Sequence, residues 1–172
     1  MNAEELRTLQ APIKALYRQQ PESALVTLSS RGELGSESLT CKVETGRGLA
    51  EAGLHELAGG DGTWACSGDM LLEALVACAG VTLRAVATAT GIEIRGGTVI
   101  AEGDLDFRGT LGVEKTVPVG FQAIRLRFDL DTSADPEQLA NLLKLTERYC
   151  VIYQTLRGPF NLSAAIATKT SA

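Results

Sequence analysis

Four cysteines provide the most distinctive chemistry of this 172-residue chain: Cys41, Cys66, Cys78 and Cys150. They are too few and too far apart for a disulfide scaffold, and no C-x-x-C pair is present. His55 is the only histidine, so a zinc site would need ligands from distant segments, and we expect no metal or organic cofactor. A thiolate can instead attack a peroxide oxygen, after which a second thiol converts the sulfenic acid to a disulfide.

Cys78 and Cys150 are the two candidates for this chemistry, because both lie on predicted helices. Cys78 falls inside the most apolar segment, residues 69–90, and Cys150 falls near the end of a later helix, on its apolar face. A thiolate near neutral pH needs an adjacent cation or a helix N-terminus, which lowers the thiol pKa from about 8.5. The pattern alone leaves open the simpler interpretation, in which both cysteines are inert core residues.

The segments around these helices predict an α+β protein. A first helix is predicted at 4–17, with Pro12 inside it, and turns are predicted at 31–33 and 46–48. Residue types and alternation predict strands at 24–28, 39–44, 98–107, 124–130 and 160–166. Cys41 is then a strand-packing residue. The order of elements indicates largely antiparallel sheet in a single domain, 1–172.

The helix at 69–90 is apolar nearly all round and ends at Gly91, which predicts a long buried central helix. A chain of this length has little material to cover such a helix, so a homodimer is favoured. The later helix begins at Asp135-Pro136-Glu137-Gln138, where Asp135 can cap and Gln138 completes a capping box.

Composition limits the partners. A net charge of -5 and no cluster of Lys or Arg argue against a general nucleic-acid binder. The N-terminus lacks the apolar region of a secretory signal, and the longest strongly apolar stretch, 74–83, is about half of what a spanning helix needs. We expect a soluble cytoplasmic protein without a membrane partner.

Three motifs resemble the OsmC/Ohr family, the osmotically inducible protein C and organic hydroperoxide resistance proteins. The run SGDMLLEALVAC at 67–78 resembles the helix with the first family cysteine, and ERYC at 147–150 resembles the second. The run GFQAIRLRF at 120–128 resembles the strand before it. The likeness covers roughly 38–168, and residues 1–20 add an N-terminal helix.

The resemblance implies an intertwined homodimer, with sites at the subunit interface, that reduces hydroperoxides in an oxidative stress response. By the match, Cys78 is the peroxidatic cysteine and Cys150 the resolving one, in peroxiredoxin-type cysteine chemistry. Arg47 and Asp69 are the nearest equivalents of the family's arginine and carboxylate: Arg47 would stabilise the thiolate and Asp69 would hold the guanidinium. A thiol or dithiol reductant would restore both cysteines.

Alternatives exist for several of these residues. Arg47 is flanked by glycines and could be a solvated turn residue, and Asp69 could cap its helix. Glu73 is a second candidate carboxylate, and Cys66 is a second choice of partner for Cys78. His55 is a loop residue in this interpretation, since a thiolate activated by a cation needs no base.

Two departures from the organic-hydroperoxide branch point to the broader OsmC-like group: Val151 stands where that branch has proline, and the helix around Cys78 is poor in aromatic residues. The predicted function is a thiol peroxidase for organic hydroperoxides or hydrogen peroxide. The alternative is a non-catalytic OsmC-like dimer that binds a small apolar ligand at its interface.

Overall fold

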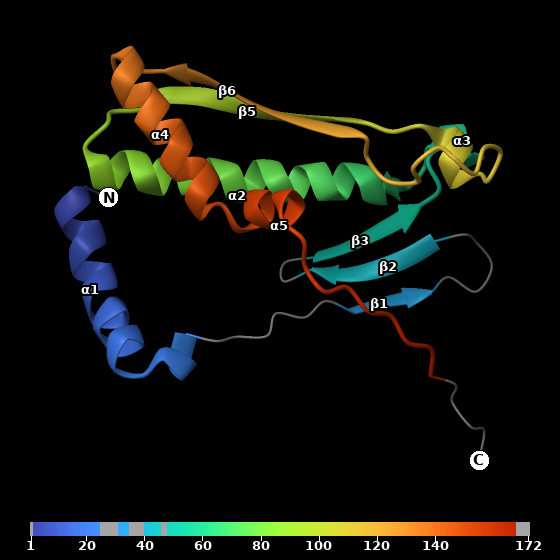
Figure 1. The fold of residues 1–172 in the computed structure, drawn as a ribbon, viewed down its shortest axis with the longest axis horizontal. Helices are drawn as coiled ribbons and strands as arrows, with labels where there is room; N and C mark the ends of the chain where they lie inside the picture. The colour runs from blue at the N-terminus through green and yellow to red at the C-terminus, as the bar shows by residue number, and fades with distance from the viewer. Residues whose placement is uncertain (1, 25–30, 35–39, 46–47, 168–172) are drawn as a thin grey trace.

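The computed structural model describes residues 2–24, 31–34, 40–45 and 48–167, and its architecture mixes helices with small sheets (Figure 1). The longer helices are α1 (Ala3–Gln19), α2 (Ser67–Thr90), α4 (Pro136–Tyr149) and α5 (Val151–Arg157), with short helices η1 (Pro21–Ala24), η2 (Glu56–Ala58) and α3 (Phe107–Thr110). The strands are β1 (Arg31–Leu34), β2 (Thr40–Thr45), β3 (Gly48–Gly53), β4 (Ala65–Cys66), β5 (Gly96–Asp104) and β6 (Ala123–Asp131). The prediction of an α+β protein is confirmed.

The central element is α2, and the predicted stop at Gly91 is confirmed. Gly91 adopts φ +74°, a left-handed conformation that favours glycine, and its N–H bonds back to the last turn. Burial follows one stripe of the helix at a spacing of four residues: Leu75, Ala79, Leu83 and Ala87. Other sides stay open in the single chain, and Val81 is 72% exposed.

By length and composition α2 could also cross a membrane, with a mean hydropathy of 1.8 over its most apolar window. The stretch 74–83 alone is too short to span a membrane. The whole helix is long enough, because apolar residues continue on both sides of that stretch. The core helix of a globular protein passes the same test. The expectation of no membrane partner therefore stays a prediction.

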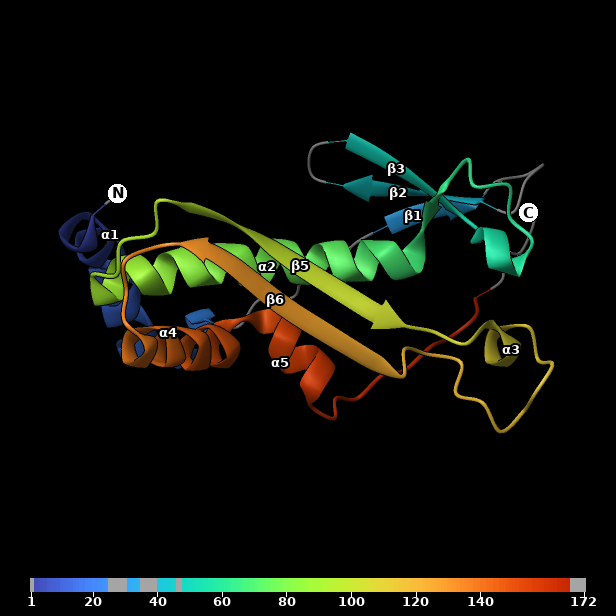
Figure 2. The ribbon, with the colours of Figure 1, turned by 90° about the horizontal axis from the view of Figure 1, so that it is seen from above.

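A two-stranded antiparallel ribbon, β5–β6, lies along α2 (Figures 1 and 2). Pairing runs without interruption from Gly96–Asp131 to Asp104–Ala123, so both predicted strands are confirmed in antiparallel register, except that the first ends at Asp104 and not at 107. In β6 the apolar side chains are half-buried, and the alternating charged ones are exposed. The ribbon therefore has one face toward the core and one toward solvent.

The later helix, α4, begins as the sequence predicts. Asp135 accepts a hydrogen bond from the N–H of Gln138 at 2.8 Å, and the Gln138 side chain accepts from the N–H of Asp135 at 3.0 Å. This capping box starts α4 beside the C-terminal end of α2, where Leu142 packs with Leu83 and Ala87 in one core cluster. The helix then crosses α2 obliquely, and its C-cap is Cys150 (Figure 1).

The second sheet, in the order β1-β2-β3-β4, lies near the N-terminal end of α2. The strand around Cys41 is confirmed as β2, but the turn predicted at 31–33 is wrong and one neighbouring strand was missed. Residues 31–33 form β1 instead of a turn, because they pair with β2, and residues 48–53 form β3, which no local alternation had indicated. Most of the strand predicted at 24–28 lies outside the described residues.

The predicted strand at 160–166 is also wrong: residues 158–167 contain no strand in the structure. A strand needs a neighbouring edge to satisfy its backbone groups, and no described strand pairs with this segment. Its alternating apolar side chains remain outside the core, and Ile166 is 96% exposed.

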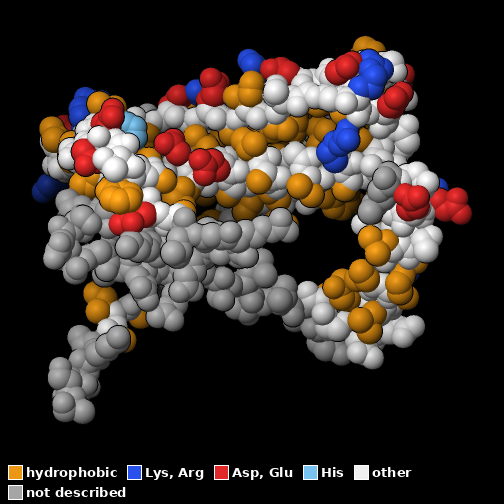
Figure 3. Space-filling view, turned by 180° about the vertical axis from the view of Figure 1, so that it is seen from behind, with side chains coloured by type: hydrophobic (Ala, Val, Ile, Leu, Met, Phe, Trp, Pro, Cys, Tyr) orange, Lys and Arg blue, Asp and Glu red, His pale blue; other side chains and the backbone are white. Residues whose placement is uncertain are grey.

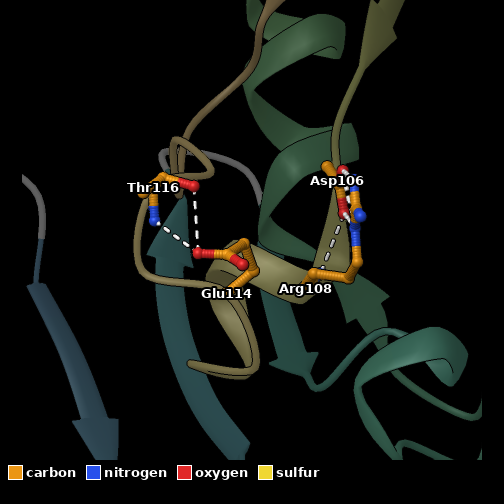
Figure 4. Close-up of polar contacts among 4 residues, drawn as sticks. All are labelled: Asp106, Arg108, Glu114 and Thr116. Carbon is orange, nitrogen blue, oxygen red and sulfur yellow. Dashed lines mark hydrogen bonds and ion pairs between the residues drawn. The ribbon is translucent and has the colours of Figure 1, made fainter.

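The long connection from β5 to β6 is held by local polar contacts (Figure 4). Asp106 caps α3 by accepting the N–H of Arg108 at 3.0 Å, and it also forms an ion pair with that guanidinium at 2.6 Å. Glu114 accepts from both the N–H and the hydroxyl of Thr116, at 3.1 and 2.9 Å. These bonds lower the pKa of both carboxyl groups and shape the connection.

Candidate active site

The candidate site is built at a corner where one helix ends and the next begins. Cys150 is at once the last cap of α4 and the first cap of α5, and its extended backbone, φ -74° and ψ 111°, turns the chain there. The Cys150 Sγ accepts a hydrogen bond from the N–H of Tyr153 at 3.5 Å. The Cys150 thiol is thus the N-cap side chain of α5.

Cys78 lies on α2 in the same core cluster. Leu75, Ala79 and Cys150 form the buried centre of this cluster, and Cys78 packs against it together with residues of β5, β6 and α5. The two cysteines, 72 residues apart in the sequence, are therefore brought together by the crossing of α2 with the α4–α5 corner. Cys66, Cys78 and Cys150 are all free thiols in the structure.

The surroundings of Cys78 favour its ionised form. Burial alone raises the pKa of this thiol. Hydrogen bonds from the N–H of Ile152, the thiol of Cys150, the N–H of Val151 and the hydroxyl of Thr82 outweigh burial, so the pKa lies below its ordinary value. Two of these four donors are backbone groups in the first turn of α5, where the N–H groups of a helix are unpaired.

Cys150 experiences the opposite effect. Burial raises its pKa first, and the N–H of Tyr153 offsets only part of that; donation to Cys78 and repulsion from the Cys78 thiolate raise it further. The thiol with the lowered pKa is also the more exposed one: Cys78 is half-buried, whereas Cys150 is 1% exposed. The pair therefore combines a half-buried thiol whose pKa is lowered with a buried thiol whose pKa is raised.

The lowered pKa of Cys78 has no cationic source among the described residues, since no Lys or Arg contributes to it. Arg47, the cation that the resemblance implies, lies outside the described residues, in the interval between the paired Thr45 and Gly48 of β2 and β3. Of the two sources of activation that the sequence left open, the start of a helix is the one present in the described structure.

The carboxylates at the start of α2 do not meet Cys78 within one chain. Asp69 precedes it by nine residues, which is about half a turn out of phase and about 13 Å along the helix axis. Asp69 and Glu73 instead line an exposed hollow of about 360 Å³ with residues of α2 and Ala101 of β5. Nor does Asp69 cap the helix, since Cys66 occupies that position.

The two remaining candidates lie elsewhere. Cys66 is the N-cap of α2 and precedes Cys78 by twelve residues, which is about 18 Å along the helix axis. The Cys66 thiol therefore cannot reach the Cys78 thiol in the same chain. His55 caps η2, with its Nδ1 accepting the N–H of Leu57 at 3.0 Å, and its ring stacks on Phe107 at 4.8 Å. Neither residue belongs to the cysteine site.

A pocket of about 400 Å³ adjoins the cysteine cluster, between β6, α4 and α5. Its apolar wall shares Leu75 and Phe128 with the cluster, and its polar groups include Glu147, Tyr153 and Arg157. A second, wider groove of about 910 Å³ lies along the same side of β6 toward the start of α4. Sequence reasoning missed α5 and with it Tyr153, because residues 149–154 carry no Gly or Pro to mark the corner.

The fold and the paired thiols define a mixed helix–sheet protein with a two-cysteine site. The OsmC-like protein family model matches residues 60–164, more than half of the chain, so this protein belongs to the OsmC-like family. The match includes both cysteines of the pair. It leaves out α1 and strands β1 to β3.

Solved structures share the fold at low identity. An OsmC-like protein from Mycoplasma pneumoniae superposes with a TM-score of 0.64 at 16% identity, over 77% of this chain and 89% of that one. An organic hydroperoxide resistance protein OsmC from Legionella pneumophila gives 0.60 at 21%, over 78% and 92%. The organic hydroperoxide resistance protein OhrB of Bacillus subtilis gives 0.54 at 20%, over 78% and 93%. The search of curated proteins gives no match.

Proposed function

We propose that this protein is a thiol peroxidase in which Cys78 attacks and Cys150 resolves. The Cys78 thiolate attacks the terminal oxygen of a hydroperoxide, the O–O bond breaks, and the departing alkoxide leaves as an alcohol after taking a proton. The resulting sulfenic acid condenses with the Cys150 thiol to give a disulfide and water. A thiol or dithiol reductant then exchanges with the disulfide and regenerates both thiols.

The observation that supports this most directly is the opposite perturbation of two neighbouring thiols. Cys78 has a lowered pKa and is half-buried, which suits an attacking thiolate, while Cys150 has a raised pKa and is almost fully buried. A resolving thiol that stays neutral and shielded does not compete for the peroxide. Some relatives with this fold are described as organic hydroperoxide resistance proteins, which agrees with the proposal.

The test is peroxide-driven loss of free thiols in wild type, Cys78→Ser and Cys150→Ser, with the disulfide identified by mass spectrometry. We expect a Cys78–Cys150 disulfide in wild type, sulfenic acid on Cys78 in Cys150→Ser, and no reaction at the site in Cys78→Ser. Cys66→Ser is the matched control, since Cys66 lies away from the pair. If both thiols survive excess peroxide, the peroxidase proposal is wrong and the apolar-ligand dimer becomes the better hypothesis.

We also propose that the protein works as a homodimer. Apolar side chains along α2 lie at the surface of the single chain (Figure 3), including Val81, and the 160–166 segment adds further unpaired apolar groups such as Phe160. A second copy would cover surface of this kind. Light scattering after size exclusion should give twice 18.2 kDa, and a mass of one chain at micromolar concentration would contradict the proposal.

The roles of Arg47 and Asp69 belong to the same proposal. Since Asp69 does not reach Cys78 in its own chain, a pairing of Asp69 with a guanidinium near Cys78 would need the partner subunit. Arg47 would then add cationic stabilisation to the N–H groups already present at the sulfur. Both assignments stay predictions.

A further inference from the structure

The corner between α4 and α5 is fastened at one residue, Glu147. In a continuing helix the carbonyl of Glu147 would accept the N–H four residues on, but α4 ends at Tyr149. The side chain of Gln154 replaces this backbone donor: its Nε2 donates to the Glu147 carbonyl at 2.7 Å. A side chain of α5 thereby satisfies the end of α4 and sets the angle between the two helices.

The neighbouring residue makes a second connection to Glu147. The ring of Tyr153 packs against the cysteine cluster. Burial and then the neighbouring carboxylate of Glu147 raise the pKa of the Tyr153 hydroxyl, which therefore stays protonated at neutral pH. Glu147 and Tyr153 also line the 400 Å³ pocket together. Two consecutive side chains of α5 thus reach back to a single residue of α4.

These connections matter because α5 has only seven residues. A helix this short is not stable by itself in water, since few hydrogen bonds repay the cost of fixing its first turn. Its orientation must therefore come from contacts with the rest of the protein. The N–H groups of Val151 and Ile152, which lower the pKa of Cys78, depend on that orientation.

We propose that Gln154 is a positioning residue for Cys78: by tying α5 to the carbonyl of Glu147, it holds the first turn of α5, which includes Ile152, packed in the same cluster as Cys78. Its catalytic consequence rests on the proposed peroxidase function. Gln154 itself is exposed and is not part of the cysteine cluster, so its effect is transmitted through the backbone of α5.

The hydrophobic cluster around Cys78 contains few titratable side chains. In its cluster, β5 contributes Val99 and Ala101, β6 contributes Ile124, Leu126 and Phe128, and α5 contributes Ile152 and Tyr153. Cys150 and Tyr153 are the titratable members besides Cys78, and Tyr153 in turn faces Glu147 and Arg157. A change of pH dependence at Cys78 in a Gln154 variant would therefore report on the α5 backbone.

The experiment is the rate of iodoacetamide alkylation of Cys78 against pH, followed in full-length protein by mass spectrometry of the Cys78 peptide. Gln154→Leu removes the donor without adding charge. We expect its alkylation midpoint to rise by about 0.5 to 1 pH unit, with about a fivefold slower reaction below the midpoint. Thr155→Val is the matched control, because the hydrogen bond of the Thr155 hydroxyl, to the Val151 carbonyl at 2.9 Å, lies within α5. Its midpoint should equal that of wild type.

Tyr153→Phe provides a second variant, which keeps the packed ring and loses the hydroxyl, and it should move the midpoint in the same direction. Identical midpoints in wild type, Gln154→Leu and Tyr153→Phe would overturn the proposal, as would a wild-type midpoint at the value of an ordinary free thiol. If the midpoint shifts while wild type consumes no peroxide, the role of Gln154 stands and the peroxidase function fails.

Discussion

The α4–α5 corner and the outer face of the β5–β6 ribbon differ in the interactions that their polar groups make. At the corner, two thiols sit in an apolar cluster and are controlled mainly by uncharged donors, above all backbone N–H groups. On the ribbon, full charges meet in exposed pairs, such as Arg95 with Asp131 at 2.5 Å and Arg127 with Asp129 at 3.0 Å. Water screens the second kind of interaction and is largely excluded from the first.

The comparison shows that the number of charges is a poor guide to where chemistry can occur. The ribbon carries several ion pairs, yet each carboxylate and guanidinium there is already neutralised by a neighbour and open to water. At the corner a modest set of hydrogen bonds separates the acidities of two identical groups. Partial burial makes those bonds consequential, because less water reaches the half-buried Cys78 sulfur to replace a lost donor.

Removing packing at the corner should produce the largest effect on stability. Leu75 is almost fully buried against Ala79 and Cys150, so Leu75→Ala should lower the free energy of unfolding by about 2 to 5 kcal/mol. Urea titration followed by circular dichroism measures this. Val113→Ala, in the exposed β5–β6 connection, is the control and should change stability by less than about 0.5 kcal/mol. Equal losses in the two variants would show that the corner is not a packed core.

The pH dependence of Cys78 should give the next largest effect. Because its pKa is lowered, the reactive thiolate persists below the pH range in which a free thiol ionises, and it is lost as the pH falls through the folded-state pKa. The rate of reaction with peroxide should therefore be flat above that pKa and fall about tenfold per pH unit below it. Stopped-flow measurement with Cys150→Ser isolates the first step. A midpoint at or above that of free cysteine would contradict the perturbation.

Local sequence signals predicted much of the fold. The apolar run ending at Gly91, the capping box at Asp135 and Gln138, and the alternation in β6 each act within a few residues, and each was confirmed. The motifs also identified Cys78 and Cys150 as a pair, and the structure places both in one cluster.

What the sequence did not predict depends on long-range packing. The break at Cys150 has no Gly or Pro, and the chain turns there because the thiol packs against α2 and caps α5. The alternation at 160–166 is typical of a strand, but none of the described strands pairs with this segment. The donors to Cys78 are backbone groups of Val151 and Ile152, which no residue type could have indicated.

The smallest effect is expected on the ribbon, from Arg125→Gln. Arg125 bonds to Asp104, with Nη2 to Oδ1 at 2.7 Å, and lies 3.6 Å from Glu102, and these bonds raise its pKa further above that of free arginine. All three side chains are about half exposed or more, so solvent screens the pairs and their loss should move the melting temperature by no more than about 2 °C. Differential scanning calorimetry should show that the difference in melting temperature between wild type and Arg125→Gln becomes smaller as the salt concentration rises. Salt weakens the Arg125 ion pairs in wild type, so the substitution then has less to remove. Alkylation of Cys78 should not change at all. A larger loss of stability, or a shifted Cys78 midpoint, would show that the charged face and the cysteine corner are coupled through β6, and the contrast between the two regions would then fail.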